Sequence, residues 1–250
     1  MHSTPVALVT GATQGIGHQI AKELASQGFK VLVGARNLDA GVAAAWAIGG
    51  AAQAIRLDVT DQASILAASQ QIQETLGRLD VLVNNAGIGH PAPPGTPLEE
   101  MRESGKMTRI SIDDMRVVFD TNVFGVVAVT RAMLPLLRKA PAGRIVNVSS
   151  SGGSLTLKDN PASYSRSYVG VYQVSKTALN AITQAFAIEL EGTNIKVNAV
   201  CPGFTATAAT RFAEGAASVE KAAREPVRLA LLDADGPTGT FSNAAGPLPW

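Results

Sequence analysis

The feature that most constrains the fold of this chain is a regular alternation of short apolar runs with longer segments of helical periodicity. The apolar runs are rich in Val, Ile and Leu without polar residues in between, so they predict strands that are buried on both faces. Strands of that kind, separated by helices, form a parallel sheet with helices on each side. The predicted strands are residues 6–10, 30–34, 54–57, 81–83, 144–148, 196–200 and 240–241.

The segments between these strands have the spacing of amphipathic helices. The predicted helices are residues 15–27, 40–48, 62–76, 111–137, 171–190 and 218–232. Seven strands alternating with helices predict an α/β protein with a doubly wound, parallel seven-stranded sheet, the Rossmann fold. No shift in composition and no repeat divides the 250 residues, so we expect a single domain over 1–250.

Three segments, near residues 88–110, 151–171 and 204–217, are not needed to build this sheet, and each follows a predicted strand. Open α/β sheets bind ligands at the edge where the strands end. We therefore expect substrate-side loops; the alternative is that long loops are simply tolerated at the surface. Their apolar side chains favour an apolar or aromatic ligand: Phe204, Phe212, Leu155, Tyr164 and Tyr168. Their charged side chains would instead suit an acid: Lys158, Arg166 and Arg211.

Charge and cysteine content narrow the function classes. A net charge of +1 without basic or acidic blocks argues against nucleic acid or an anionic membrane as the main partner. The single cysteine, Cys201, excludes an internal disulfide and fits a reducing compartment. No uninterrupted apolar run is long enough for a membrane span, and the first strand begins too early for a signal peptide, so we expect a cytoplasmic protein. The histidines His2, His18 and His90 are too scattered for a metal site, and we interpret His90 as a solvated loop residue.

A glycine-rich turn directly follows the first predicted strand. Gly11, Gly15 and Gly17 have the spacing Gly-x-x-x-Gly-x-Gly between that strand and the first helix. Glycines there let the backbone approach a pyrophosphate, and the helix N-terminus supplies free N–H groups and a partial positive charge. The turn therefore predicts a dinucleotide site; the alternative is a tight turn that binds no ligand.

The second predicted strand leads into Arg36, about where a dinucleotide fold meets the adenosine ribose. An acidic side chain there would favour NAD, whereas an arginine suits a ribose phosphate. The sequence therefore favours NADP(H), with NAD(H) as the alternative if Arg36 is only a solvated surface residue. Asp58, after the third strand, is placed either to contact the adenine or to cap the next turn.

Tyr172 and Lys176 lie four residues apart in a predicted helix, and therefore one turn apart on one face. Free tyrosine has a pKa of about 10, and a nearby ammonium favours the phenolate and lowers that pKa. We expect the pair to act as general acid for a developing alkoxide, or as general base for an alcohol. The alternative is an exposed tyrosine and lysine on a helix surface.

Several motifs stand in a fixed order: TGATQGIG at 10–17, LDVTD at 57–61, NNAG at 84–87, TNVFG at 121–125, GRIVNVSS at 143–150, YQVSK at 172–176 and PGFTAT at 202–207. In these motifs the chain resembles the single-domain branch of the short-chain dehydrogenase/reductase superfamily, especially its carbonyl-reductase-like members, over essentially its whole length. The resemblance implies an NADPH-dependent carbonyl reductase, or alcohol dehydrogenase in reverse, that transfers hydride between nicotinamide and a ketone or aldehyde.

The resemblance also implies roles for individual residues. Tyr172 would exchange a proton with the substrate oxygen, Lys176 would bind the nicotinamide ribose and lower the pKa of the tyrosine, and Ser150 would hydrogen-bond the substrate carbonyl. Its neighbours Ser149 and Ser151 are the alternatives for that last role.

Other positions would hold a water, the substrate or the cofactor. Asn122 would hold a water of the proton relay behind the lysine, and Phe204 would contact the substrate. The implied cofactor residues are Gly11, Thr13, Gln14, Gly15, Ile16, Gly17, Arg36, Asp58, Val59, Asn85, Ala86, Gly87, Tyr172, Lys176, Pro202, Gly203, Thr205 and Thr207.

Two positions depart from the common family pattern. Ser150 and Tyr172 are 22 positions apart (172 − 150), which is longer than usual and similar to carbonyl-reductase-like members. There the insertion adds structure beside the active site and can block the common tetramer interface, so we expect a monomer or homodimer. Gln14 stands where many NADPH-using relatives have Arg or Lys, so selectivity for the phosphate would depend on Arg36.

Two other functions remain open. A nucleotide-binding sensor or scaffold without turnover would be expected to lose part of the catalytic set, which this chain keeps. Reduction of the carbon–carbon double bond of an enone would use the same scaffold, and turnover of a saturated ketone would distinguish it. The sequence does not set the direction of the reaction.

Overall fold

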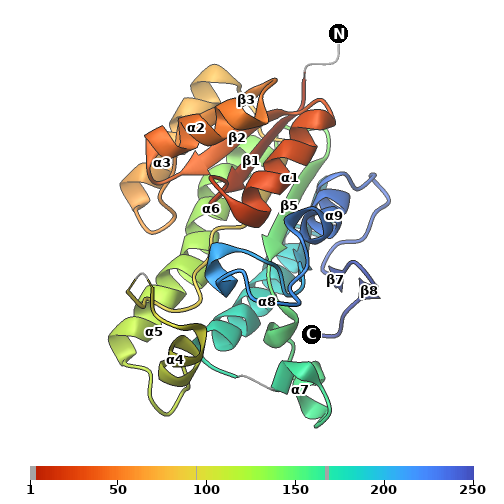
Figure 1. Cartoon of the computed structure of the whole chain (residues 1–250). Helices are drawn as coiled ribbons and strands as arrows, with labels where there is room; N and C mark the ends of the chain where they lie inside the picture. Colours follow the sequence, from red (N-terminus) through yellow and green to blue (C-terminus); the bar gives the residue numbers. More distant parts are fainter. Residues whose placement is uncertain (1–3, 94, 167–168) are drawn as a thin grey trace.

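The computed structural model describes residues 4–93, 95–166 and 169–250. Within this part of the chain, one eight-stranded sheet has the order β3-β2-β1-β4-β5-β6-β7-β8 (Figure 1). The strands are β1 (Val6–Thr10), β2 (Lys30–Ala35), β3 (Ala52–Arg56), β4 (Val81–Asn84), β5 (Gly143–Val148), β6 (Ile195–Val200), β7 (Phe241–Asn243) and β8 (Gly246–Pro247). All pairs are parallel except β7 with β8. The predicted doubly wound, seven-stranded parallel sheet is therefore confirmed, with a short antiparallel strand added.

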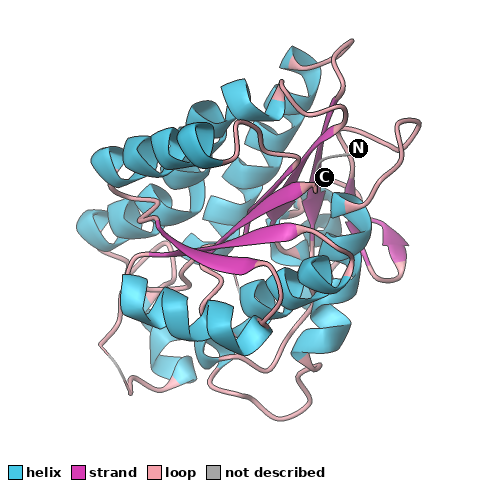
Figure 2. Ribbon diagram, turned by 90° about the horizontal axis from the view of Figure 1, so that it is seen from above, coloured by secondary structure: helices cyan, strands magenta, loops and turns pink. Residues whose placement is uncertain are grey.

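Helices cover both faces of the sheet (Figure 2). They are α1 (Gly15–Ser26), α2 (Leu38–Ile48), α3 (Gln62–Thr75), α4 (Leu98–Ser104), α5 (Ile112–Phe119), α6 (Gly125–Leu137), α7 (Leu155–Asp159), α8 (Val171–Glu189) and α9 (Val219–Ala230). One hydrophobic core lies between the sheet and α1, α2 and α9, and the other lies between the sheet and α3, α6 and α8. Along β1, Ala7 and Val9 enter one core and Val6 and Leu8 the other, which explains the uninterrupted apolar run.

The helix predicted at residues 111–137 is interrupted near its middle. A π turn, η1 (Asp120–Phe124), separates α5 from α6, and an insertion this local is not visible in the apolar spacing. The whole run, Ile112–Leu137, is long and apolar enough to cross a membrane by length and composition alone. Its side chains Val129 and Met133 are fully buried against the sheet, as in a core helix, whereas Ile112, Val117 and Phe124 are exposed.

The strand order reverses at β1, which has β2 on one side and β4 on the other. Such a switch point opens a crevice at the carboxyl ends of the strands. The three segments expected on the substrate side follow β4, β5 and β6 at this edge, but they are not only loops. They contain α4, then η2 (Ser151–Gly153), α7 and η3 (Tyr164–Arg166), and then η4 (Ala208–Thr210). Tyr168 and His2 lie outside the described residues, as does the side chain of Tyr164.

A row of buried polar side chains fixes the helices behind the crevice. Asn84 Nδ2 donates to Asn147 Oδ1 at 2.9 Å and to Thr130 Oγ1 at 3.1 Å. Asn147 Nδ2 in turn donates to Thr183 Oγ1 at 2.9 Å. Because these residues lie on β4, β5, α6 and α8, the row holds α8 in a defined position against the strands that end at the crevice.

The last residues of the chain hold the inserted segment before α8. The rings of Phe241 and Trp250 stack with their centroids 5.5 Å apart. The carbonyl of Trp250 accepts hydrogen bonds from Ser154 Oγ at 3.1 Å and from Thr156 N at 3.0 Å. The start of α7 is therefore attached to the edge of the sheet.

Candidate active site

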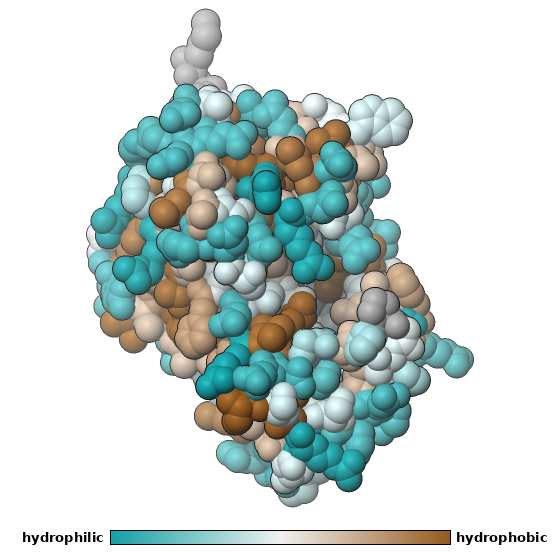
Figure 3. Space-filling view, turned by 90° about the vertical axis from the view of Figure 1, so that its left-hand side faces the viewer, coloured by the Kyte–Doolittle hydropathy of each residue, from teal (hydrophilic) through white to brown (hydrophobic). Residues whose placement is uncertain are grey.

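A cavity of about 1260 Å³ lies at the carboxyl ends of the central strands. Pockets for single small molecules usually measure about 300–1,000 Å³, so this one has room for more than one ligand. One side of the molecule is hollowed near its middle, with hydrophobic and hydrophilic side chains around the hollow (Figure 3). Of the residues that the family resemblance assigns to the site, Asn122 and Thr205 do not line the cavity, whereas all the others do. Thr205 is buried, and its hydroxyl donates to Gly203 O at 3.1 Å, so it shapes the turn instead. Of the loop side chains considered for the ligand, Phe204 and Phe212 line the cavity, whereas Leu155, Lys158, Arg166 and Arg211 do not.

The glycine-rich turn between β1 and α1 is tightly built. Gly11 has a φ of 63°, in the left-handed region, and a Cβ there would lie 2.9 Å from Ala86 Cα. A Cβ on Gly17 would clash with Asn85 Nδ2, so α1 starts directly against the end of β4. Gln14, the residue before α1, provides no side-chain cap, so the first N–H groups of the helix remain available at the cavity.

The segment after β4 is fixed to the end of β1. Thr10 Oγ1 accepts hydrogen bonds from the N–H groups of Asn85 and Ala86, both at 3.0 Å. A Cβ on Gly87 would lie 3.2 Å from Asn122 Oδ1 and 3.5 Å from Lys176 Nζ. The predicted NNAG residues therefore cross the cavity from the glycine-rich turn to the predicted lysine.

Arg36 and Asp58 lie at the other end of the cavity, after β2 and β3. Asp58 Oδ1 accepts hydrogen bonds from the N–H of Thr60 at 3.0 Å and its hydroxyl at 2.7 Å. Asp58 therefore caps the turn, and its contact with the adenine stays a prediction. These bonds, together with Arg36 and Arg56 nearby, hold the pKa of Asp58 below its usual value.

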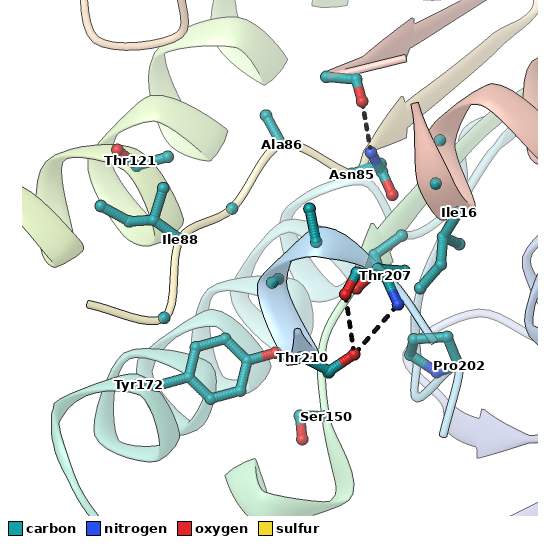
Figure 4. A pocket seen from close by; sticks show the side chains of 18 of the residues that line it. Ile16, Asn85, Ala86, Ile88, Thr121, Ser150, Tyr172, Pro202, Thr207 and Thr210 are labelled. Carbon is teal, nitrogen blue, oxygen red and sulfur yellow. Dashed lines mark hydrogen bonds between the residues drawn. The ribbon is translucent and has the colours of Figure 1, made fainter. Parts of the chain in front are cut away.

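The structure separates the three neighbouring serines after β5. The hydroxyl of Ser149 is buried and donates to Asn180 Oδ1 at 2.5 Å. Ser151 opens η2, where its carbonyl accepts from Ser165 Oγ. The side chains of Ser150 and Tyr172 instead both face the cavity (Figure 4), and the Ser150 hydroxyl acts to lower the pKa of Tyr172. Despite the long insertion, Ser150 is therefore the serine paired with the tyrosine.

Tyr172 and Lys176 lie on the first turns of α8, as the spacing predicts. Lys176 Nζ is 5.6 Å from the centre of the Tyr172 ring and donates to Val148 O at 2.8 Å. Lys176 is only 4% exposed, and its backbone touches Gly153, where a Cβ would lie 2.8 Å from Lys176 C. The close approach of this glycine allows the strand end that carries the serines to pack directly on α8.

The expected net lowering of the Tyr172 pKa is wrong. The pKa of Tyr172 is raised above 10, mainly because burial disfavours the phenolate, with a smaller effect of Cys201; the hydrogen bond with Ser150 acts in the opposite direction. Burial also lowers the pKa of Lys176 to about 8, so the charge that should favour the phenolate is itself disfavoured. At neutral pH the pair is a phenol and an ammonium.

Asn122 lies in the π turn and is fully buried. Its side chain accepts a hydrogen bond from Ile88 N at 2.9 Å and donates to Ile88 O at 2.8 Å and to Ser175 Oγ at 3.0 Å. The amide therefore fixes the segment after β4 against α8. Its predicted role as holder of a relay water stays a prediction.

Sequence reasoning missed many residues of the cavity wall, among them His90 and Thr210. His90 lies in a loop, as expected, but it is half-buried and lines the cavity. Thr210 Oγ1 donates to Thr205 O at 2.6 Å and accepts from Thr207 N at 3.0 Å, which holds η4 over the cavity (Figure 4). Neither residue belongs to a sequence motif. The partner of His90 is distant in the sequence, and the partners of Thr210 lie within or beside a short helix.

Comparison with known proteins places this site in a family. A family model described as short chain dehydrogenase matches residues 5–216. A short-chain dehydrogenase of Penicillium roqueforti is 37% identical, over 90% of this chain and 88% of its own length. This chain belongs to the short-chain dehydrogenase/reductase family. (+)-Neomenthol dehydrogenase of Arabidopsis thaliana is 32% identical over 94% of each chain. Salutaridine reductase from Papaver somniferum has a similar structure, with a TM-score of 0.79 and 29% identity, over 96% of this chain and 99% of that one.

This short-chain dehydrogenase/reductase is therefore an NAD(P)-dependent oxidoreductase that acts on CH–OH or C=O groups. The residues of its cavity fit such a dinucleotide. The uncapped N-terminus of α1 offers N–H groups to a pyrophosphate, and no acidic residue stands in its first turn to repel one. Among the described residues, no three His, Cys, Asp or Glu side chains come together as metal ligands would.

Proposed function

We propose that this protein is an NADPH-dependent carbonyl reductase that acts on ketones or aldehydes. The observation that carries this proposal is Tyr172, paired with Ser150 in the cavity and with its pKa raised by burial. A raised pKa keeps the phenol protonated, which is the form that a reduction requires.

A bound nicotinamide supplies the hydride for the reduction, or accepts it in the reverse direction. The hydroxyls of Ser150 and Tyr172 donate hydrogen bonds to the substrate oxygen and stabilise the negative charge that develops on it. Tyr172 then gives its proton to that oxygen, and the ammonium of Lys176, one helical turn away, stabilises the phenolate that is left. Oxidation of an alcohol needs the phenolate from the start, which burial disfavours, so reduction is the direction that the site supports at neutral pH.

Support for NADPH over NADH comes from Arg36. Its side chain is exposed at the end of the cavity where the carboxylate of Asp58 is already bonded to Thr60. A charge-assisted hydrogen bond is worth about 1.5–3 kcal/mol, so Arg36→Ala should raise the Kd for NADPH at least about tenfold. The Kd for NADH should stay nearly unchanged. Arg56→Ala, an exposed arginine outside the cavity, is the matched control, and equal losses for both cofactors would contradict the role of Arg36.

The reaction is tested by the loss of reduced nicotinamide absorbance with NADPH and with NADH. The substrates are aryl ketones, aliphatic ketones, α-keto esters and enones. Apolar side chains of the cavity wall, among them Phe204 and Phe212, favour apolar or aromatic ketones. Ketone-dependent oxidation that is faster with NADPH supports the proposal. Tight cofactor binding without turnover of any carbonyl compound would refute it.

We further propose a monomer or homodimer. The family resemblance implies that the long helix Ile112–Leu137 and α8 are the candidate subunit interfaces. Here the inserted α7 lies against α8, with Lys158 Nζ 3.4 Å from Thr177 Oγ1, which leaves less of α8 for a neighbour. The long helix also has exposed apolar side chains, Val117 and Phe124. They could pack against the same helix of a second copy in a two-fold symmetric dimer. Light scattering should give the mass of one or two chains, and a tetramer would refute the proposal.

A further inference from the structure

The place of Ser150 opposite Tyr172 depends on how the end of β5 is held. The Ser150 hydroxyl accepts a hydrogen bond from Gly152 N at 3.2 Å, inside the same short turn. This bond orients the hydroxyl, but it does not attach the hydroxyl to the helix that carries Tyr172. The distance between the two side chains is therefore determined by the contacts that the neighbouring residues make with α8.

The two residues that precede this serine are both bonded to α8. Lys176 Nζ donates to Val148 O at 2.8 Å, and Ser149 Oγ donates to Asn180 Oδ1 at 2.5 Å. Asn180 lies four residues after Lys176, which in turn lies four residues after the tyrosine, so the three side chains follow one face of the helix. One face of α8 therefore carries the phenol, the ammonium and the amide that holds the end of β5.

The stability of the fold does not account for an asparagine at position 180. Asn180 is only 4% exposed, and among the described residues its Nδ2 has no hydrogen-bond partner and is enclosed by protein atoms. Turning the amide over would only exchange an unpaired nitrogen for an unpaired oxygen. A buried polar group without a partner costs about 1–3 kcal/mol. Alanine would avoid this cost and has a higher helix propensity.

The hydroxyl of Ser149 has a second acceptor close by. Lys176 O is 3.4 Å from Ser149 Oγ, whereas a good bond between two oxygens measures about 2.7–2.8 Å. Without Asn180 the hydroxyl would turn to this carbonyl, and a good bond would need a shift of about 0.6 Å at the strand end. Because Ser150 is the next residue, its hydroxyl would move relative to Tyr172 by a similar amount.

We propose that Asn180 is a positioning residue for the reduction: through Ser149 it holds Ser150 where both it and Tyr172 reach one substrate oxygen. Asn180 does not line the cavity, so it acts only through this contact. The inference rests on the proposed carbonyl reduction and adds a residue to its machinery. A misplacement of about 1 Å can cost 10²-fold in rate, so a shift of about 0.6 Å should cost about tenfold.

The first test compares Asn180→Ala with Ser149→Ala. Both break the same bond, so kcat/KM for a ketone should fall about tenfold in each, with the Kd for NADPH nearly unchanged. Asn180→Ala also removes the unpaired nitrogen, so its Tm should stay within about 2 °C of the wild type. Ser149→Ala leaves the whole amide unpaired, which costs about 1–3 kcal/mol, so its Tm should fall by about 2–12 °C. A merely structural role would instead make the loss of activity follow the loss of stability.

A double-mutant cycle with Ser150→Ala tests whether Asn180 acts through the serine. In the Ser150→Ala background, Asn180→Ala should cause no further loss of kcat/KM, because the hydroxyl that it positions is gone. An equal loss in both backgrounds would refute the inference, as would a wild-type rate in Asn180→Ala. A wild-type protein that reduces no ketone would instead refute the proposed function, so the two failures are distinguishable. If Asn180→Ala does not fold, Ser149→Ala takes its place in the same cycle.

Discussion

Replacement of Gly17 by alanine tests how the cofactor turn is built. The new methyl group would overlap Asn85 Nδ2 and lie 2.7 Å from Gly11 O. Asn85 can move away only by giving up its bonds to Thr10 O at 2.9 Å and to Gly11 O at 3.1 Å. Two such bonds contribute about 1 kcal/mol each, while alanine in a helix gains about 0.5–1 kcal/mol over glycine. With the steric overlap added, we expect the free energy of unfolding to fall by about 1–2 kcal/mol.

Thermal unfolding measures this loss. For a chain of 250 residues, each kcal/mol shifts Tm by about 2–4 °C, so Tm should fall by about 2–8 °C. The displaced residues line the cavity, so the Kd for the cofactor should rise about tenfold, the factor that corresponds to 1.4 kcal/mol. Lys22→Ala, an exposed change on the same helix, is the control and should cost less than about 0.5 kcal/mol. An unchanged Tm and an unchanged Kd in Gly17→Ala would refute the tight packing of α1 on β4.

Two further predictions concern the acid–base group. Tyr172→Phe keeps the ring but removes the proton donor, so kcat for ketone reduction should fall about 10²–10⁴-fold while the Kd for the cofactor stays nearly unchanged; reduction at the wild-type rate would contradict the role of the tyrosine. The pKa of Lys176 is lowered to about 8, so its charge is present below that pH and lost above it. Because the charge stabilises the phenolate that forms, kcat/KM for reduction should decrease as the pH rises through about 8, and a flat profile across this range would count against the lysine.

The strands were predictable because burial on both faces leaves a continuous apolar run in the sequence. The third strand was predicted at residues 54–57 and found at Ala52–Arg56, because β3 is an edge strand whose Gln53 and Arg56 are exposed. The π turn was not predictable, since it changes the backbone bonding of a helix without changing its apolar spacing.

The site was predictable where its residues are close in sequence. Tyr172 and Lys176 share a helix face, and the glycine-rich turn is contiguous. The direction of the pKa shift of Tyr172 was not predictable, because it depends on enclosure by segments that are far away in the chain. The position of His90 likewise depends on Asn122 and Ser104, neither of which is its sequence neighbour.

The row of buried polar side chains behind the crevice has a consequence for the evolution and engineering of this protein. An apolar replacement of Asn147 alone would leave Asn84 without one acceptor and Thr183 without its donor. Replacing all members of the row together removes donors and acceptors at once and is far less costly. We therefore expect these positions to exchange as a block. A library of single substitutions would find every one of them intolerant, whereas a combinatorial library would reach working alternatives.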